Sequence, residues 1–219
     1  MSVHRHKDPG RRDGIIRPLW AVIDLGRVRH NVTYLKGLTG PSCKFMAVVK
    51  ANAYGHGEAQ VARAALSAGA DCLGVALVEE AERLRDERFD CPVYLLFEPP
   101  PEGASRAVEM DTICSVYTEE FARALSEAAL DQGKTALVHV KVDSGMHRVG
   151  VAPGRASAFA TAIDTPRIAL APRLDLVLVP SSSIIALSIS TWSRTSMPSS
   201  SGKIFSLTLR TAFSTPLPR

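Results

Sequence analysis

Apolar residues follow two alternating spacings through most of the chain. Short, nearly continuous apolar runs are typical of strands buried on both faces of a parallel sheet, and they occupy residues 19–24, 45–49, 72–76, 93–97, 113–116 and 136–142. Between them, apolar residues recur at intervals of three and four, which predicts helices at residues 25–38, 61–69, 79–88, 103–110, 118–130 and 155–163. Strands and helices in alternation predict an α/β fold with a parallel sheet, for which a (β/α)8 TIM-type barrel is the natural candidate.

The pattern changes near residue 170. Residues 171–219 are rich in Ser, show no helical spacing, and contain no Asp or Glu after Asp175. We therefore divide the chain into a disordered basic arm at residues 1–16, an α/β domain at residues 17–170, and an irregular Ser-rich tail at residues 171–219.

Composition and charge restrict the classes of function. The chain has 219 residues, of which 46% are hydrophobic and 22% charged, as is ordinary for a globular protein. The four basic residues after Asp175 account for the whole net charge of +4, and basic residues do not form a stripe with interleaved aromatic residues. We therefore expect no nucleic-acid partner.

The sequence lacks membrane-spanning runs, a signal peptide and metal-ligand motifs, which sets what we expect of location and metal content. The apolar runs are strand-sized, so no membrane partner is expected, and residues 1–16 lack the apolar core of a signal peptide. The four cysteines are widely separated, without a C-x-x-C pair or a His cluster at ligand spacing. We expect a cytoplasmic protein with reduced thiols and no metal site.

A lysine stands where a predicted buried strand meets its loop. Lys50 follows residues 45–49 and precedes a loop rich in Gly and small polar residues. Parallel α/β folds place their chemistry at this end of their strands. An amine partly removed from water can act as a neutral nucleophile toward a carbonyl group. On spacing alone, a structural lysine that extends its amine to water is the commoner case.

Two motifs carry a resemblance to a known family. Residues 47–57, AVVKANAYGHG, are similar to the signature of the alanine racemases, which are fold-type III pyridoxal-phosphate enzymes. Residues 138–150, VHVKVDSGMHRVG, resemble the K-x-D-x-G-M-x-R-x-G segment of the same family. The resemblance runs from about residue 17 to about residue 166 and then stops.

The resemblance implies pyridoxal 5'-phosphate as cofactor and roles for four residues. Lys50 matches the catalytic lysine, which binds the cofactor covalently and then acts as one of two acid/base groups. Tyr54 matches a tyrosine whose hydroxyl contacts the cofactor phosphate. Arg148 matches an arginine near the cofactor's phenolic oxygen and the substrate carboxylate, where a guanidinium suits an oxyanion. Lys141 matches a lysine that the family often carbamylates, which creates a carboxylate that orients the arginine.

Structural roles remain open for these positions. In the structural alternative, Tyr54 is an aromatic residue packed under the loop and Arg148 is a surface ion-pair partner. Lys141 is then an unmodified lysine at a strand end. The histidines within the motifs, His56, His139 and His147, are expected to be packed and hydrogen-bonded without a catalytic role. The charged run at residues 79–88, which includes the ion-pair spacing from Glu79 to Arg83, is expected to be a solvated helix face.

The resemblance also implies an incomplete barrel. In the family, the strand near residue 20 belongs to a companion β-domain, which leaves about five of the eight barrel strands, and the C-terminal β-domain is absent. The implied function is interconversion of L-alanine and D-alanine for cell-wall precursors, with alanine as the small-molecule partner. The second acid/base group of the family is a tyrosine from the β-domain of the other subunit of a homodimer. No position here matches that tyrosine, so we expect impaired or absent activity, and the homodimer stays open for this chain.

Two alternatives remain. A non-catalytic pyridoxal-phosphate homeostasis protein has the same barrel and about this length, although the motifs KANAYGHG and GMHRVG favour the racemases. An unstable, non-functional fragment with unpaired strand edges is the other. The substrate is open as well, because related racemases take serine or lysine.

The acid-free composition of the tail predicts a frame-shifted translation of a longer gene. Translating the nucleotide sequence downstream of about codon 170 in the other two frames is expected to restore a family-like continuation. If neither frame gives one, the tail is a divergent extension and the prediction is wrong.

Overall fold

The computed structural model describes residues 22–39, 43–171, 176–180 and 187–189. The predicted basic arm at residues 1–16, and most of the predicted tail, lie outside these ranges. No helix in the described part of the chain is long and apolar enough to cross a membrane.

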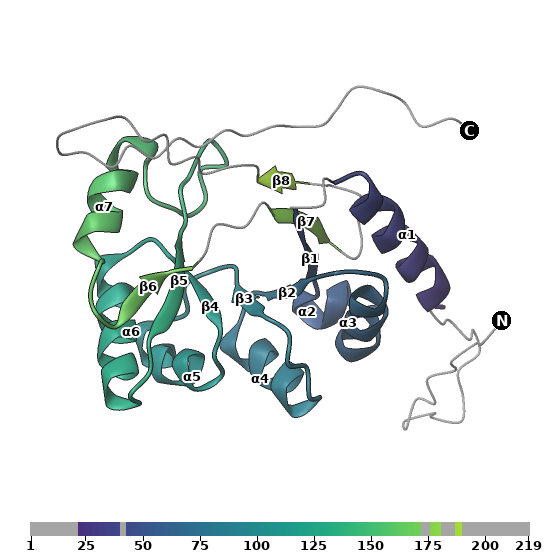
Figure 1. Cartoon of the computed structure of the whole chain (residues 1–219), viewed down its shortest axis with the longest axis horizontal. Helices are drawn as coiled ribbons and strands as arrows, with labels where there is room; N and C mark the ends of the chain where they lie inside the picture. The colour runs from purple at the N-terminus through teal and green to yellow at the C-terminus, as the bar shows by residue number, and fades with distance from the viewer. Residues whose placement is uncertain (1–21, 40–42, 172–175, 181–186, 190–219) are drawn as a thin grey trace, which may run out of the picture.

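Strands and helices alternate along the described chain (Figure 1). The first six strands are β1 (Lys44–Val48), β2 (Cys72–Val75), β3 (Val93–Leu95), β4 (Ile113–Val116), β5 (Ala136–Val140) and β6 (Ile168–Leu170). The longer helices are α1 (Leu25–Gly37), α3 (Glu58–Ser67), α4 (Val78–Asp86), α5 (Ala104–Glu109), α6 (Glu119–Asp131) and α7 (Ala156–Ala162). Short 3-10 turns, η1 (Pro101–Gly103) and η2 (Pro153–Arg155), lead into α5 and α7, and one helical turn, α2 (Lys50–Tyr54), follows β1.

All the strands in the described ranges belong to one sheet. Its order is β6-β5-β4-β3-β2-β1-β7-β8, and the strands from β1 to β6 pair in parallel with their neighbours in the chain. Strand β7 (Leu176–Pro180) pairs in parallel with the other edge of β1, and β8 (Leu187–Ile189) pairs antiparallel with β7. The described strands therefore form an open sheet, which confirms the predicted α/β fold with an incomplete barrel. No separate β-domain occurs among them.

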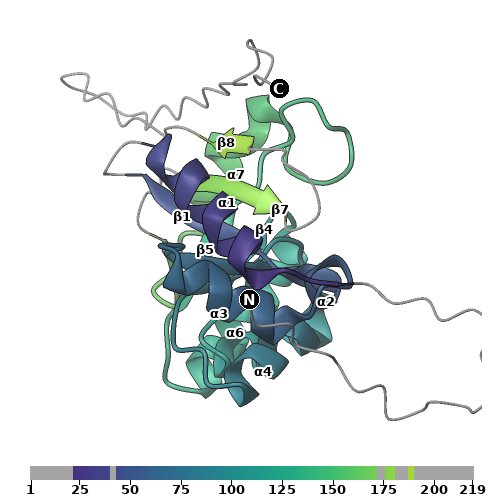
Figure 2. The ribbon, with the colours of Figure 1, turned by 90° about the vertical axis from the view of Figure 1, so that its right-hand side faces the viewer.

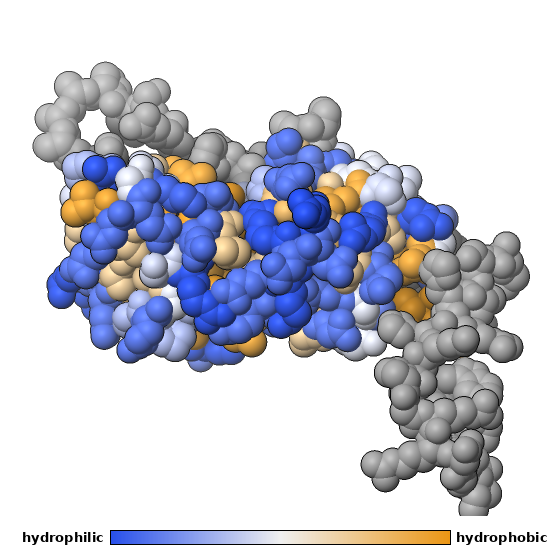
Figure 3. Space-filling view, turned by 90° about the horizontal axis from the view of Figure 1, so that it is seen from below, coloured by the Kyte–Doolittle hydropathy of each residue, from blue (hydrophilic) through white to orange (hydrophobic). Residues whose placement is uncertain are grey.

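Successive side chains of each strand pack on opposite faces of the sheet. The helix-covered face holds the larger core, which includes Phe45, Leu73 and Val93. The other face holds a smaller cluster, here called the inner-face cluster, of Met46, Val48, Cys72, Tyr94 and Ile113. Helices α3, α4 and α6 lie together below the sheet in Figure 2. Figure 3 shows a mostly hydrophilic surface on that side, as expected for helices that bury one apolar stripe.

Two sequence expectations at the ends of the domain were wrong. The described part of the strand predicted at residues 19–24 is not a strand, because Asp24 caps α1 and accepts hydrogen bonds from the amides of Gly26 at 2.8 Å and Arg27 at 3.2 Å. The tail predicted to be irregular contains β7 and β8, since the open edge of β1 offers unpaired backbone groups to an apolar segment. The short strand β6 was not predicted.

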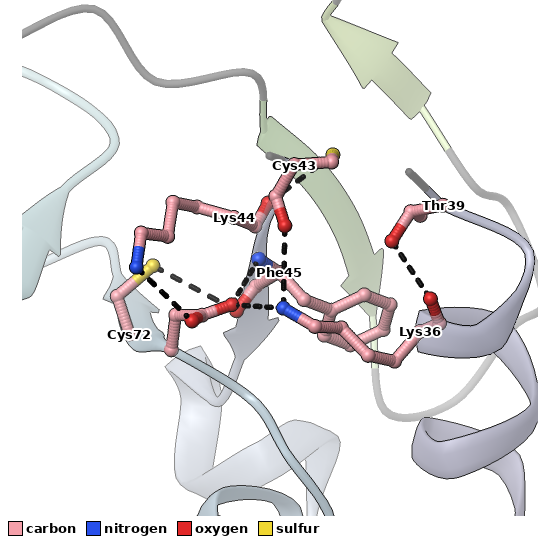
Figure 4. Close-up of polar contacts among 7 residues, drawn as sticks. Lys36, Thr39, Cys43, Lys44, Phe45 and Cys72 are labelled. Atoms are coloured by element: carbon pink, nitrogen blue, oxygen red, sulfur yellow. Dashed lines mark hydrogen bonds and ion pairs between the residues drawn. The ribbon is translucent and has the colours of Figure 1, made fainter. Parts of the chain in front are cut away.

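A charge cluster ties α1 to the beginning of β1 and β2. The Asp71 carboxylate accepts the amide hydrogen of Phe45 at 2.7 Å and forms ion pairs with Lys36 and, at 3.4 Å, with Lys44. Lys36 also donates to the carbonyl of Cys43 at 3.2 Å, and Figure 4 shows how Lys36, Lys44 and Phe45 converge. Burial acts to raise the pKa of Asp71, but the hydrogen bonds from Lys36 and Phe45 and the two positive charges lower it overall.

Replacing Asp71 with Asn is expected to lower the free energy of unfolding by about 1–3 kcal/mol at pH 7. A carboxyl group with a lowered folded pKa stabilises the fold above its ordinary pKa of 3.8, and this contribution is lost as pH falls through the folded value. The difference between wild type and Asp71→Asn should therefore shrink below about pH 4 in urea unfolding measured across pH. Asp131→Asn, at an exposed position, is the control. A difference that stays constant down to pH 2 would contradict the electrostatic interpretation.

Candidate functional site

Three cationic side chains surround one aromatic ring. The Lys141 Nζ lies 4.3 Å from the ring centroid of Phe97, the Arg148 Cζ 5.0 Å, and the Lys50 Nζ 5.2 Å. The Lys50 Nζ also lies 5.9 Å from the ring centroid of Tyr54. Cations within about 6 Å of a ring centroid are attracted by the electron-rich face of the ring. The structure thus brings three of the four predicted site residues together around Phe97 and places the fourth, Tyr54, beside Lys50; we call these residues the Phe97 cluster.

The order of the sheet explains this convergence. Lys50 follows β1, Phe97 comes just after β3, and Lys141 follows β5, so the ring lies between the two lysines. In a flat sheet, β1 and β5 would be about 19 Å apart, because neighbouring strands are about 4.8 Å apart. The ring of Phe97 lies two strand positions from each lysine, so the long lysine side chains approach it from both sides.

The chain turns with left-handed backbone angles directly after Lys50. Ala51, Asn52, Ala53 and Tyr54 have φ angles between 52° and 55°, and Gly55 ends the turn with φ 83°. Left-handed angles cost an L-residue other than Gly roughly 1–2 kcal/mol each, so the surrounding structure must hold this turn in place.

Glu80 provides the first of these restraints. One of its carboxylate oxygens accepts the amide hydrogen of Ala51 at 2.6 Å, and the other accepts those of Ala76 at 2.8 Å and Leu77 at 3.2 Å. The side chain is only 4% exposed. The prediction that the run at residues 79–88 is a solvated face is therefore wrong for Glu80.

The predicted pairing of Glu79 with Arg83 also differs from the structure. Arg83 forms its ion pair with Glu58 at 3.2 Å, and Glu79 pairs with Arg106 at 3.0 Å. Both arginines thus connect neighbouring helices rather than successive turns of α4.

Two motif side chains hold the rest of the left-handed turn. The Asn52 side-chain oxygen accepts the amide hydrogen of Glu58 at 2.9 Å, where α3 begins. The His56 Nδ1 lies 2.8 Å from the carbonyl of Ala53 and 3.1 Å from that of Tyr54. Since carbonyl oxygens only accept, Nδ1 carries a hydrogen, and His56 has the packed role that the sequence predicted.

The second motif forms a closed loop that presents Arg148. The Asp143 side chain accepts the amide hydrogens of Gly145 and His147, both at 3.0 Å. The chain then returns to β5, because the amide of Val151 donates to the carbonyl of Lys141 at 2.8 Å. Gly150, with φ 129°, packs so closely that a Cβ atom there would lie 2.6 Å from the Asp143 nitrogen.

The Phe97 cluster carries positive charge without a compensating carboxylate. Among the residues that the structure describes, no acidic side chain forms a salt bridge with Lys50, Lys141 or Arg148. The Lys141 Nζ donates to the carbonyl of Leu96 at 2.6 Å. Burial, and then the charges of Arg148 and Lys50, lower the pKa of Lys141. Such a site is suited to bind an anion.

Tyr54 supplies a neutral hydrogen-bond donor beside these cations. Its ring packs against the inner-face cluster, so part of the structural role left open by the sequence is present. Burial, with a smaller contribution from the charge of Glu80, raises the pKa of Tyr54. The phenol therefore keeps its hydrogen at neutral pH and can donate it to an anion.

The sheet beneath the cluster is apolar and aromatic. His139 precedes Lys141 by two positions in the chain, and its ring centroid lies 5.4 Å from that of Tyr94. Burial lowers the pKa of His139, which favours the neutral imidazole, in line with its predicted packed role. No group of three or more His, Cys, Asp or Glu side chains in the described chain is arranged to hold a metal ion.

Two residues of the site were not predicted. Phe97 ends a run interpreted only as a buried strand, and Glu80 was hidden in a charged run. A usable signal existed for Glu80, because it occupies the third position of α4, where a Glu commonly folds back onto backbone amides. No comparable signal identified Phe97.

Comparisons with known proteins point to one family. Residues 23–179 match a family model described as "Alanine racemase, N-terminal domain". The chain is 43% identical to the alanine racemase of Desulfovibrio desulfuricans over 143 residues, which cover 65% of this chain and 38% of the relative. The chain thus spans less than two fifths of the length of this relative.

Solved structures of alanine racemases are also similar to this chain. Alanine racemase from Clostridium difficile 630 superposes with a TM-score of 0.66 at 34% identity, covering 71% of this chain and 41% of that one. Alanine racemase from Bacillus anthracis with bound L-Ala-P gives a TM-score of 0.63 at 30% identity, covering 74% and 42%. The family model, at residues 23–179, covers strands β1 to β6 and both motifs.

Replacing Lys141 with Met is expected to raise the free energy of unfolding by about 0.5–2 kcal/mol at pH 7 in buffer free of carbon dioxide. The reason is that burial and like charge oppose the ammonium form more than its bond to Leu96 favours it. Because the folded pKa of Lys141 is lowered, this penalty is full below that pKa and fades as pH rises toward the ordinary value of 10.5. Denaturant unfolding of the wild type and of Lys141→Met between pH 7 and pH 10 measures this gain in the free energy of unfolding.

Lys134→Met is the control for this prediction. Lys134 donates to the carbonyls of Val108 and Glu109 at 3.1 Å and pairs with Asp111 at 2.9 Å, so its loss should lower stability. Equal losses for Lys141→Met and Lys134→Met would contradict the interpretation of Lys141.

Proposed function

The chain belongs to the alanine racemase N-terminal domain family, and from this premise we propose that it binds pyridoxal phosphate through Lys50 and supplies the lysine half of a site that racemises alanine. The observation that carries the proposal is the convergence of Lys50, Lys141 and Arg148 on the ring of Phe97. An amine for covalent attachment thus lies within a cluster of cations suited to an anionic cofactor and a substrate carboxylate.

The donor set fits the cofactor. Lys50 offers the amine that attaches to an aldehyde, and the protonated phenol of Tyr54 offers a donor for the phosphate. Arg148 offers a guanidinium for the phenolic oxygen and the substrate carboxylate. When bound, pyridoxal phosphate withdraws electrons from the substrate and so makes its Cα hydrogen acidic.

In this proposal each residue has a defined task. The Lys50 Nζ would hold the cofactor and would also take or return a proton on one face of the substrate Cα. The Phe97 ring restrains the lysine amine between β1 and β5. Arg148 orients the substrate through its carboxylate, so that the Cα hydrogen points toward Lys50.

Lys141 is proposed to be the carbamylated residue. Its lowered pKa favours the neutral amine, which attacks carbon dioxide, forms an N–C bond and releases one proton. The product is a carboxylate beside Arg148, which replaces one of three like charges by an opposite one. Bicarbonate should then raise the free energy of unfolding of the wild type and not that of Lys141→Met. For this reason the unfolding of Lys141→Met is compared with that of the wild type in buffer free of carbon dioxide.

The full reaction needs a second acid/base group on the opposite face of the substrate. We propose that this chain supplies only the Lys50 half, so its racemisation rate should be several orders of magnitude below that of a two-base site. The substrate proposed is alanine, with serine and lysine still open. The proposed setting is the cytoplasm and the proposed purpose is D-alanine for cell-wall precursors.

The proposed attachment is tested by incubating the chain with pyridoxal phosphate, reducing with borohydride and mapping the labelled peptide. We expect saturable label at Lys50, and at 100 times the dissociation constant about 2.7 kcal/mol of added stability in a thermal unfolding assay. Lys50→Ala should lose both effects. Lys44→Ala, at the opposite end of β1, should keep both.

The outcomes distinguish a cofactor-binding protein from a non-functional fragment, and a half-site from a complete racemase. Absence of label at Lys50 contradicts the proposed function and favours a non-functional fragment. Label without measurable turnover of either alanine enantiomer fits a half-site and a homeostasis protein alike. Turnover equal to that of a full-length racemase would contradict the half-site.

A further inference from the structure

We propose that Glu80 is a positioning residue for Lys50: by accepting the amide hydrogen of Ala51, it fixes the left-handed turn that directs the Lys50 amine to the Phe97 ring. This inference rests on the proposed function of Lys50. The contact joins Glu80 to the residue that directly follows the lysine, at 2.6 Å.

The amide of Ala51 needs a partner from outside the turn. Within the turn, the amide of Ala53 donates to the carbonyl of Val49 at 2.8 Å, and that of Gly55 donates to the carbonyl of Ala51 at 3.0 Å. The amide of Ala51 comes too early in the turn for such a bond, as at the start of any helix. Glu80 accepts the amide hydrogen of Ala51, which is the first residue of the turn with left-handed backbone angles.

The carboxylate also ties the end of β1 to the end of β2. Its second oxygen accepts the amide hydrogens of Ala76 and Leu77, which lead from β2 into α4. Since β1 and β2 pair in parallel, this link fixes the height of Lys50 relative to the neighbouring strand end. Motion of either loop would therefore move the lysine.

The environment of Glu80 supports a specific role. Among the described residues no cation forms a salt bridge with Glu80, although the side chain is buried. A buried carboxylate is costly unless hydrogen bonds compensate it, and here three backbone amides do so. Capping α4 would need only one oxygen, and the other serves Ala51.

Glu98, which directly follows Phe97, is another carboxylate whose oxygens accept backbone amide hydrogens near the site. It follows β3 closely, and its oxygens accept from the amides of Tyr117 and Thr118 and from the Thr118 hydroxyl at 3.0 Å. All of these partners lie at the start of α6. Glu80 differs because one of its partners is adjacent to Lys50.

The charge of Glu80 also reaches the far end of the turn. It adds to burial in raising the pKa of Tyr54, the last left-handed residue. The same carboxylate thus helps to orient the amine of Lys50 and to keep the phenol of Tyr54 as a donor.

The test compares Glu80→Gln with the wild-type chain. A glutamine keeps the shape but has only one accepting oxygen, so it can serve Ala51 or the β2 loop but not both. We expect hydrogen exchange of the Ala51 amide, followed by NMR, to become faster by about tenfold or more. We also expect the ratio of pyridoxal-phosphate label at Lys50 to label at Lys134 to fall by about tenfold.

Two further variants distinguish positioning from loss of stability. Asp71→Asn weakens the fold at the opposite end of β1 and should leave the labelling ratio unchanged. Ala51→Gly in the Glu80→Gln background should restore part of the ratio, because Gly adopts left-handed angles without strain. A merely structural Glu80 would give neither result.

Three results would overturn the inference. These are unchanged exchange of the Ala51 amide in Glu80→Gln, faster exchange with an unchanged labelling ratio, and an equal fall of the ratio in Asp71→Asn. If the wild-type chain is not labelled at Lys50, the proposed function fails separately, and exchange at Ala51 still decides whether Glu80 holds the turn.

Discussion

Four consecutive residues after Lys50 adopt left-handed backbone angles, and the position of the lysine amine depends on how this turn is held. L-residues avoid these angles, so a turn of this kind persists only where its neighbours determine it. Glu80, Asn52 and His56 each bind the backbone within or beside the turn. The motif around Lys50 is thus mainly a set of backbone restraints, and only Lys50 and Tyr54 have side chains in the Phe97 cluster.

Positive charge is unfavourable at one residue of the Phe97 cluster, because burial and the charges of Arg148 and Lys50 lower the pKa of Lys141. Three cations share one ring, and no carboxylate in the described chain pairs with them. Functional sites commonly retain groups that oppose stability, because their binding partner relieves the conflict. The large helix-side core and the Asp71 cluster offset that cost elsewhere in the fold.

Much of the fold could be predicted from the sequence because the strands are buried on both faces and read as continuous apolar runs. The limits of β4 were predicted to the residue, whereas β6 has only three residues, too few to show a period. The tail strands could not be predicted, because their pairing depends on an open edge of β1 that only the assembled sheet provides.

The site residues were predicted through motifs, and their arrangement was not. The motif resemblance identified Lys50 and Lys141, but the spacing of the strands gave no reason for them to meet, since β1 and β5 are separated by three strands. Phe97 was missed for the same reason: its role arises from the place of β3 between β1 and β5 in the sheet, which leaves no periodic signal. Glu80 was missed because a buried acid and a solvated acid look alike in a charged run.

The sheet order has a consequence for how the chain folds. From β1 to β6 every strand pairs with its predecessor, so each addition closes only a short loop and costs little chain entropy. Lys50 and Lys141, however, belong to the first and fifth strands of that series. Their meeting at Phe97 must wait until the intervening pairings have formed, so a ligand that recognises the cluster would bind only molecules in which the sheet has assembled at least as far as β5.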